Sequence, residues 1–334
     1  MYKKSWKSLL LAAVTIVASA GSLAHNAQAQ DAANYPEQTI RLVVPYAPGG
    51  ASDFLARIAA PKMSALLGQQ IVVDNRSGGA GNFGMDIAAR AAPDGYTLFL
   101  GDIGAVALNP HVYADMTVKP LEDFIPVSVM TETPLLLVAH PDVPAANVEE
   151  LVTHVKANPG KLSFASPGSS TLDRLVMERF RSLAGMELNH VPYGGGAGPA
   201  AADVIGGHVQ LMFGTISSTL PHVQTGKLKA LAVSTSERTP ALPDTPTVGD
   251  LGYGDATGVA WQGLFVQTGT PQAIVDKLHA AVVEVMNDPE VKSRIAERGG
   301  KAVSNDSPAS FLKYIQDDEA KWAAVIQEVG IKAD

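Results

Sequence analysis

The feature that most constrains this chain is a regular alternation of short apolar runs with longer amphipathic stretches. Strand-like runs rich in β-branched residues occur at 39–47, 69–75, 96–102, 125–130, 135–141, 161–167, 189–193, 209–215, 228–235 and 259–267. Helical patterns lie between most of them, at 53–67, 82–92, 147–157, 170–184, 197–205, 271–287 and 308–329. Strands that alternate with helices predict an α/β fold with largely parallel sheets. Several runs are apolar on both faces, which is typical of strands covered by helices on two sides.

The first 30 residues have the pattern of a secretory leader. Three lysines precede a twelve-residue apolar run, Leu9–Ala20, and the stretch ends in the small-x-small sequence Ala27-Gln28-Ala29. We therefore expect a signal peptide that is cleaved after Ala29 and a mature protein in the periplasm. A membrane anchor is disfavoured, because twelve residues at 1.5 Å each cannot cross about 30 Å of hydrocarbon.

Composition narrows the class of ligand and partner. Cleavage after Ala29 removes three of the 25 basic residues and none of the 33 acidic ones, which leaves a net charge of −11. An acidic chain without a basic cluster disfavours nucleic acid and anionic lipid as partners. The absence of cysteine excludes a disulfide and a lipid on cysteine. The hydrophobic content of 46% is ample for two lobes.

Glycine-rich turns follow three of the expected strands, and each precedes a helical pattern. They contain Pro48–Asp53, Pro167–Thr171 and Gly194–Gly198. Such a turn points free backbone N–H groups and a helix N-terminus at the space beyond the strand, where open parallel sheets bind ligands. Any single turn could equally be a plain tight connection. Three of them, two rich in hydroxyl groups, favour a cleft that binds an anion.

A fourth glycine-rich segment matches the sequence pattern of a dinucleotide-binding turn. Gly79, Gly81 and Gly84 fit G-x-G-x-x-G, and Asp102 follows 18 residues later, at the end of an apolar run. A true fingerprint begins directly at the end of its strand. Here five residues, 74–78, stand between the strand core and the first glycine. We interpret the segment as a turn and helix start near the mouth of the cleft, and we expect no cofactor.

Catalytic signatures are missing. The sequence has neither G-x-S-x-G nor H-E-x-x-H, and its eight histidines are scattered without a ligand-like pair. His190 lies in a strand-like run and is interpreted as structural. Absence of cysteine excludes thiol catalysis. We therefore expect no catalytic residue, no metal site and no enzyme activity, although carboxylate pairs formed by folding stay open.

Several long segments resemble the Bug family, the solute receptors of tripartite tricarboxylate transporters. The resemblance runs from about Tyr35 to the C-terminus and is strongest at 35–58, 68–102, 120–130, 190–213 and 226–252. It implies a type II periplasmic-binding-protein fold, with two Rossmann-like α/β lobes around a central ligand cleft and two crossing strands between them. We expect lobe 1 at residues 30–132 and 258–334 and lobe 2 at 133–257.

The resemblance also implies a function. Members of the family capture small carboxylates, including di- and tricarboxylates, amino acids and aromatic acids, and deliver them to a two-component inner-membrane permease. We expect a monomer with this role. A ligand-presenting sensor subunit for a signalling receptor is the alternative, and an exported enzyme acting on a carboxylate is a remoter one.

The family's ligand contacts come largely from the loop after the first strand and the loop that opens the second lobe. Tyr193 and Phe213 are weaker matches to the family's motifs, and Trp261 is the residue we would turn to if the second loop were not part of the site. The full set of expected ligand-binding residues is Tyr46, Pro48, Gly49, Gly50, Ala51, Ser52, Asp53, Gly168, Ser169, Ser170, Thr171, Arg174, Tyr193, Phe213 and Trp261.

Three positions depart from the usual family pattern. An alanine-glycine-asparagine-glycine turn is replaced by Pro167–Ser170, a frequent histidine by Arg174, and the aspartate of a common MFDN motif by Gly214. The loss of an acid and the gain of a cation near the cleft would favour a second negative charge on the ligand. Arg174 could equally be a solvated helix residue.

The leader gives the first testable prediction. Mature protein isolated from a Gram-negative host should begin at Gln30 and carry no lipid, as intact-mass and N-terminal peptide analysis will show. A product that keeps Met1 or partitions with membranes would contradict the expected compartment.

Overall fold

The structure is a computed structural model that describes residues 34–168, 170–193 and 197–332. Its strands are β1 Ile40–Val44, β2 Ile71–Asn75, β3 Thr97–Asp102, β4 Phe124–Ala139, β5 Ser163–Ser166, β6 Asn189–Pro192, β7 Leu211–Thr215, β8 Lys229–Val233, β9 Val259–Gln267 and β10 Lys301–Ala302. Its α-helices are α2 Ala51–Leu67, α3 Asn82–Ala89, α4 Asn109–Val112, α5 Pro120–Asp123, α6 Val148–Ala157, α7 Leu172–Ala184, α8 Ala197–Ile205, α9 Ile216–Gln224, α10 Gln272–Asn287, α11 Pro289–Ala296 and α12 Pro308–Val329. Three short helical turns are η1 Gly79–Gly81, η2 Gly104–Leu108 and η3 Gly254–Ala256.

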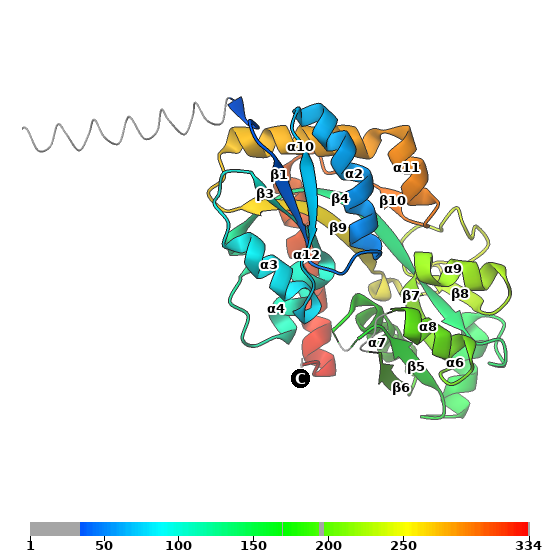
Figure 1. The fold of residues 1–334 in the computed structure, drawn as a ribbon. Coiled ribbons are helices and arrows are strands. Elements are labelled where there is room, and N and C mark those ends of the chain that lie inside the picture. The colour runs from blue at the N-terminus through cyan, green and yellow to red at the C-terminus, as the bar shows by residue number, and fades with distance from the viewer. Residues whose placement is uncertain (1–33, 169, 194–196, 333–334) are drawn as a thin grey trace, which may run out of the picture.

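One long strand, β4, joins the two halves of the molecule. In the described residues the strands follow the order β2-β1-β3-β9-β4-β7-β5-β6, with β10 and β8 also paired to β4. The β2-β1-β3-β9 side is lobe 1, and the β7-β5-β6 side with β8 is lobe 2. Figure 1 shows β4 running out of lobe 1 into lobe 2. The parallel pairs β1–β2, β1–β3, β5–β6 and β5–β7 confirm the expected α/β fold.

Two expected strands, 125–130 and 135–141, are one continuous strand in the structure. The polar stretch Thr131–Pro134 reads as a break in the sequence, but its backbone stays extended because β9 runs antiparallel beside it as far as the pair Pro134↔Val259. Register shifts between Pro126 and Ser128 and between Val129 and Thr131 mark irregular positions along this pairing. The crossing between the lobes is therefore a paired ribbon.

The hydrophobic core is continuous on one face of this ribbon and divided on the other. On the face covered by α12, α7 and α3, a single cluster reaches from lobe 1 to lobe 2 and includes Phe99, Leu137, Phe213, Trp261 and Trp322. On the opposite face, one cluster under α2 and α10 belongs to lobe 1, and a separate one under α8 and α9 belongs to lobe 2. The lobes are thus fused along one side and open along the other.

Ser234 ties the two crossing segments together. Its buried hydroxyl accepts the N–H of Leu135 at 2.9 Å and donates to the carbonyl of Gly258 at 2.6 Å. Its own backbone N–H and carbonyl also bond to Leu135 and Gly258. One residue at the end of β8 therefore satisfies polar groups of both segments where they pass between the lobes.

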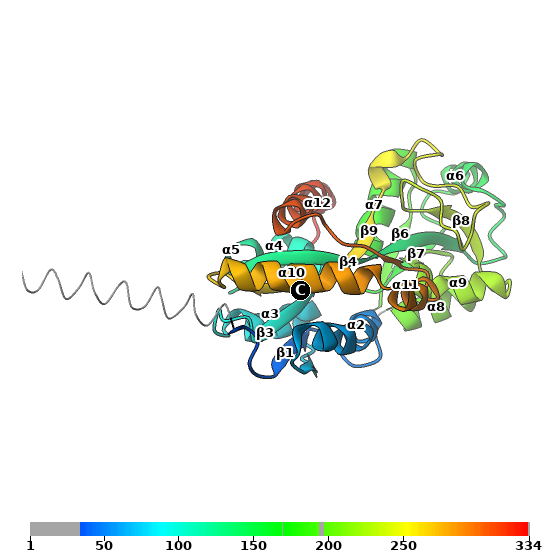
Figure 2. The same cartoon turned by 90° about the horizontal axis from the view of Figure 1, so that it is seen from above.

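The C-terminal helix α12 lies on the opposite side of the sheet from α2 (Figure 2) and contacts η2 of lobe 1 and α7 of lobe 2. Its first half packs Phe311 edge-on against Trp261 of β9, with ring centroids 5.6 Å apart. In its second half, Glu328 forms an ion pair with Arg179 of α7 at 3.2 Å. None of the helices in the described ranges has the length and apolar character needed to cross a bilayer.

We expect Ser234→Ala to destabilise the fold by about 2–4 kcal/mol, because it leaves a buried N–H and a buried carbonyl without their partner. The free energy of unfolding in urea measures this loss. Ser293→Ala, at an exposed serine of α11, is the matched control and should change stability by less than about 0.5 kcal/mol. Equal effects of the two variants would contradict the role assigned to Ser234.

Candidate functional site

The turn between β1 and α2 is exposed at its tip and tightly held at its base. Residues 47–51 are exposed, whereas Ser52 and Asp53 are buried. Asp53 is the third residue of α2 rather than its cap, and its carboxylate accepts the N–H of Gly49 and pairs with Arg57, both at 2.9 Å. The hydrogen bond from Arg57, above all, lowers the pKa of Asp53. The carboxylate of Asp53 thus shapes the turn.

Ser52 connects this turn to the crossing strands. Its hydroxyl accepts a hydrogen bond of 2.5 Å from the side-chain amide of Gln262 in β9, and the amide oxygen of Gln262 accepts from Thr131 of β4 at 3.2 Å. The start of α2 is thereby fixed to the ribbon between the lobes.

Tyr46, which follows β1, and Asp102, the last residue of β3, are hydrogen-bonded to each other in lobe 1. The hydroxyl of Tyr46 donates to the carboxylate of Asp102, which also accepts the backbone N–H of Ala105 at 2.8 Å. Burial is the main cause that raises the pKa of both side chains. Asp102, the acid of the apparent dinucleotide fingerprint, therefore holds the first turn of η2 through the N–H of Ala105.

The glycines of that fingerprint serve the protein's own packing. Gly79, Ala80 and Gly81 have φ angles of +54°, +53° and +97°, and they form η1. A Cβ on Gly84 would lie 2.7 Å from Cα of Pro45, so this glycine lets α3 approach the end of β1. The segment is the turn and helix start that the sequence predicted.

The turn between β5 and α7 is held by hydroxyl groups. Ser166 and Thr171 both donate to the carbonyl of Gly168, at 2.8 and 3.1 Å. His190 lies 2.7 Å from the Ser166 hydroxyl, and burial lowers the pKa of its imidazole to about 4. Ser166 donates to Gly168, so the neutral imidazole donates to Ser166. Gly168, Ser170 and Thr171 are partly exposed, and Ser169 lies outside the described residues.

Arg174 and Tyr193 make contacts within lobe 2. Arg174 pairs with Glu178 of the same helix at 3.3 Å, and its own side chain is 16% exposed. The Tyr193 hydroxyl donates to Asp203 of α8 at 2.6 Å, and burial raises the pKa of this tyrosine to about 12. Arg174 is therefore an ion-paired helix residue in this conformation.

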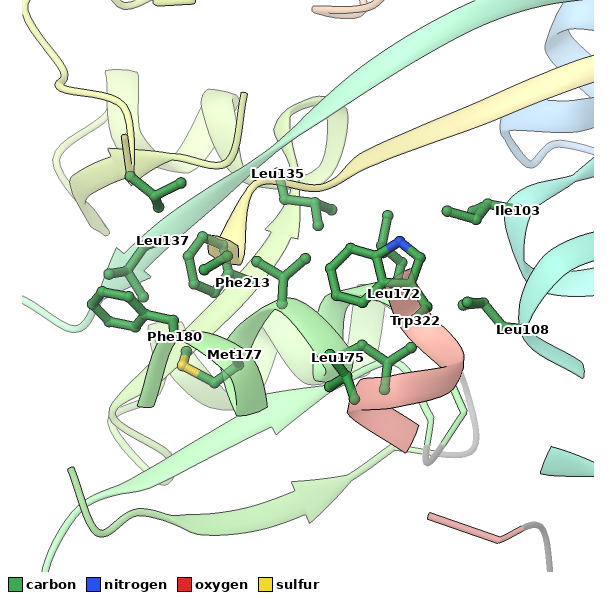
Figure 3. Close-up of a cluster of buried hydrophobic side chains, with 14 of the residues drawn as sticks. Ile103, Leu108, Leu135, Leu137, Leu172, Leu175, Met177, Phe180, Phe213 and Trp322 are labelled. Atoms are coloured by element: carbon green, nitrogen blue, oxygen red, sulfur yellow. The ribbon is translucent and has the colours of Figure 1, made fainter. Parts of the chain in front are cut away.

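Two expected ligand contacts, Phe213 and Trp261, need correction, because their side chains are fully buried. Figure 3 shows the Phe213 ring in the core beside Phe180 and Leu137. The indole of Trp261 packs under α12 and donates to Asp318 at 2.8 Å. In this conformation neither side chain has surface that a ligand could touch.

The three helices that follow β1, β5 and β7 begin without a capping side chain. These are α2, α7 and α9, whose N-cap residues are Gly50, Thr171 and Thr215. The Thr171 hydroxyl bonds to a carbonyl instead, and that of Thr215 lies 3.1 Å from the hydroxyl of Ser218. Helices α3, α4, α5 and α10 also lack a side-chain cap, whereas capping side chains complete α6, α11 and α12. Uncapped first turns leave N–H groups for an anion.

A cavity of about 420 Å³ lies between the lobes on the divided face of the core. Lobe 1 contributes Ala51 and Phe54 of α2, lobe 2 contributes Ser217 and Ser218 of α9, and the crossing ribbon contributes Thr131, Thr133 and Gln262. Another hollow, of about 510 Å³, is lined by residues 82–90 and 113–118 of lobe 1 alone. Only the first joins both lobes, as a cleft that closes around a ligand requires.

The sequence matches the family model of the tripartite tricarboxylate transporter family receptor over residues 55–331. It is 33% identical over 324 residues to protein BugT of Bordetella pertussis. The matched region is 97% of this chain and 98% of BugT.

The chain belongs to the tripartite tricarboxylate transporter receptor family.

Solved structures agree with this assignment. Rpa4515 of R. palustris, described with adipate, is 31% identical with a TM-score of 0.79, over 89% of this chain and 99% of that one. MatC of Rhodopseudomonas palustris, described with bound malate, is 32% identical with a TM-score of 0.75, over 87% and 100%. BugD, described as a periplasmic binding protein, is 32% identical with a TM-score of 0.76, over 90% of this chain and 100% of that one. The receptor thus has the two-lobed periplasmic-binding-protein fold that the resemblance implied.

Gly84→Ala should destabilise the receptor by about 1–3 kcal/mol, because the new methyl group would overlap the backbone of Pro45. Thermal unfolding measures this effect. Gly198→Ala in α8 is the matched control: nothing lies within 4 Å of its added Cβ, and alanine favours a helix. If Gly84→Ala were as stable as the wild type, the close approach of α3 to β1 would be wrong.

Proposed function

We propose that this receptor binds a small organic dicarboxylate between its lobes, without chemical change, for delivery to a two-component permease. The observation that carries the proposal is that the first residues of α2 and α9, two helices without a side-chain cap, line the interlobe cavity from opposite lobes. Relatives described with adipate and malate support the dicarboxylate class.

The proposed site holds a carboxylate on backbone N–H groups. The first turn of α2 offers those of Ala51 and Ser52, and the cavity adds the hydroxyls of Ser217 and Ser218. Fixed dipoles and bridging water can replace the hydration of an anion without an ion pair. The net charge of −11 is compatible with this, because salt screens exposed charges beyond about 8–10 Å. We include Pro48–Asp53, Gly168, Ser169, Ser170 and Thr171 in the site.

Closure of the lobes is the motion that fits this architecture. We propose hinges at 132/133 and 257/258, next to the Leu135–Ser234–Gly258 contacts. A ligand stabilises a closed state only through contacts that differ between the two states. The divided face, where polar Thr131 and Thr133 replace core residues, is the side that would open.

The proposal places the receptor in the periplasm as a monomer, after cleavage at Ala29. A ligand-presenting sensor subunit would have the same binding site and would differ in its partner. An exported enzyme would turn its carboxylate over, so product formation distinguishes it from a receptor.

Ala51→Pro tests the helix N-terminus directly. Ala51 is the first residue of α2, where proline suits the backbone and removes only an N–H group. Loss of one hydrogen bond to a carboxylate should weaken adipate or malate binding by roughly 10- to 150-fold, measured by titration calorimetry.

Ala51→Ser keeps the N–H group and is the matched control, which should bind at close to wild-type affinity. Thermal unfolding of both variants verifies that the fold is kept. Unchanged affinity in Ala51→Pro would remove α2 from the site. Failure of the wild type to bind any di- or tricarboxylate, amino acid or aromatic acid would contradict the proposed function itself.

A further inference from the structure

Asp173 is a buried carboxyl group that the site described so far does not use. It is the second residue of α7 and is 9% exposed. The backbone N–H groups of Thr215 and of Asp173 itself donate to its carboxyl group. Its Oδ1 atom is buried and has no hydrogen-bond partner among the described residues. A buried polar atom left without a partner calls for an explanation.

The carboxyl group of Asp173 lies where two helices begin. Its own helix, α7, starts at Leu172, and the N–H that it accepts belongs to Thr215, the N-cap residue of α9. Neither helix has a side-chain cap. Thr215 is followed directly by Ile216, Ser217 and Ser218, which line the interlobe cavity. A ligand carboxylate held at the start of α9 would therefore meet Asp173 as a neighbouring like charge.

Among the described residues, no ion pair offsets the burial of Asp173. Burial is the main cause that raises its pKa to about 7, and only the two N–H groups oppose it. Helix α7 packs against β5, β7, α12 and η3, and neither strand carries a titratable side chain. Besides Asp173, the titratable groups of α7 and of the elements around it are Arg174, Glu178, Arg179 and Arg181 on α7, Lys313, Tyr314, Asp317, Asp318, Glu319, Lys321 and Glu328 on α12, Asp255 on η3, His190 on β6 and His222 on α9.

We propose that an anionic ligand binds this cleft together with one proton, which Asp173 carries. The inference rests on the proposed function. Ionised Asp173 would repel the ligand, whereas the neutral acid would not. The negative charge of the ligand in turn raises the pKa of Asp173, so binding takes up a proton from solution. The affinity for a dianion must then fall as the pH rises.

Titration calorimetry of adipate and malate between pH 6.5 and 8.5 tests the proposal, because both acids are dianions throughout this range. If the ligand raises the pKa of Asp173 by about one unit, the wild-type affinity should fall about sixfold across the range. Buffers of different ionisation enthalpy should reveal net proton uptake near pH 7.5. Asp173→Asn keeps an acceptor for Thr215 but cannot titrate, so it should lose both the pH dependence and the proton uptake.

Asp255→Asn is the matched control. It removes one carboxylate from η3, which also packs on α7, but the Asp255 side chain is exposed and pairs with Arg179. This variant should keep the wild-type slope. A wild-type affinity that is constant or rises with pH would overturn the proposal, as would a slope that persists in Asp173→Asn.

Failure of both acids to bind would count against the proposed function. The titration of Asp173 can still be tested then, by the pH dependence of thermal unfolding. The folded state holds the Asp173 proton to a higher pH than the unfolded chain does, so the stability contributed by this group declines between about pH 4 and pH 7. Asp173→Asn should lack this decline and gain stability relative to the wild type from pH 5 to pH 8. A constant difference between the two proteins would show that Asp173 does not titrate there and would overturn the inference.

Discussion

The backbone pairing of β4 with β9 is the constraint on which the two-lobed structure depends. One strand of 16 residues supplies edge contacts to both lobes, and its partner follows it as far as Pro134. A paired ribbon satisfies its own polar groups while it crosses between two cores. The side chains on its two faces can therefore differ: apolar where the core continues, and polar where Thr131 and Thr133 line the cavity.

Much of the fold could be predicted because each element carries its own signal. All seven expected helices occur, and α8 and α12 have the expected bounds. Four helices of the described part of the chain were missed. Helices α4 and α5 have only four residues each, too few for a periodic pattern, whereas α9 directly follows a strand without a break and α11 is separated from α10 by one residue. The continuity of β4 was missed for a different reason. The extended backbone at 131–134 depends on pairing with β9, more than 120 residues away, and a local sequence pattern cannot predict such a pairing.

The candidate site was predictable to the extent that backbone turns define it. The glycine-rich turns after β1 and β5 do precede helices α2 and α7 with no side-chain cap. Side-chain directions were not predictable: Phe213 and Trp261 point into the core, and Arg174 meets Glu178 one turn along. The burial of Asp173 could not be predicted, because an acidic residue in the first turn of a helix is common and normally exposed. Its burial follows only from the contact of α7 with the end of β7.

The fused side of the core has a consequence for spectroscopy. The chain contains three tryptophans, and Trp6 lies in the expected leader. The other two, Trp261 of β9 and Trp322 of α12, are fully buried in the cluster that joins the lobes. A rotation of one lobe against the other shifts the packing around both indoles, while no tryptophan lies elsewhere in the mature chain to add background. The intrinsic fluorescence of this protein would therefore report the proposed closure of the lobes without an attached dye.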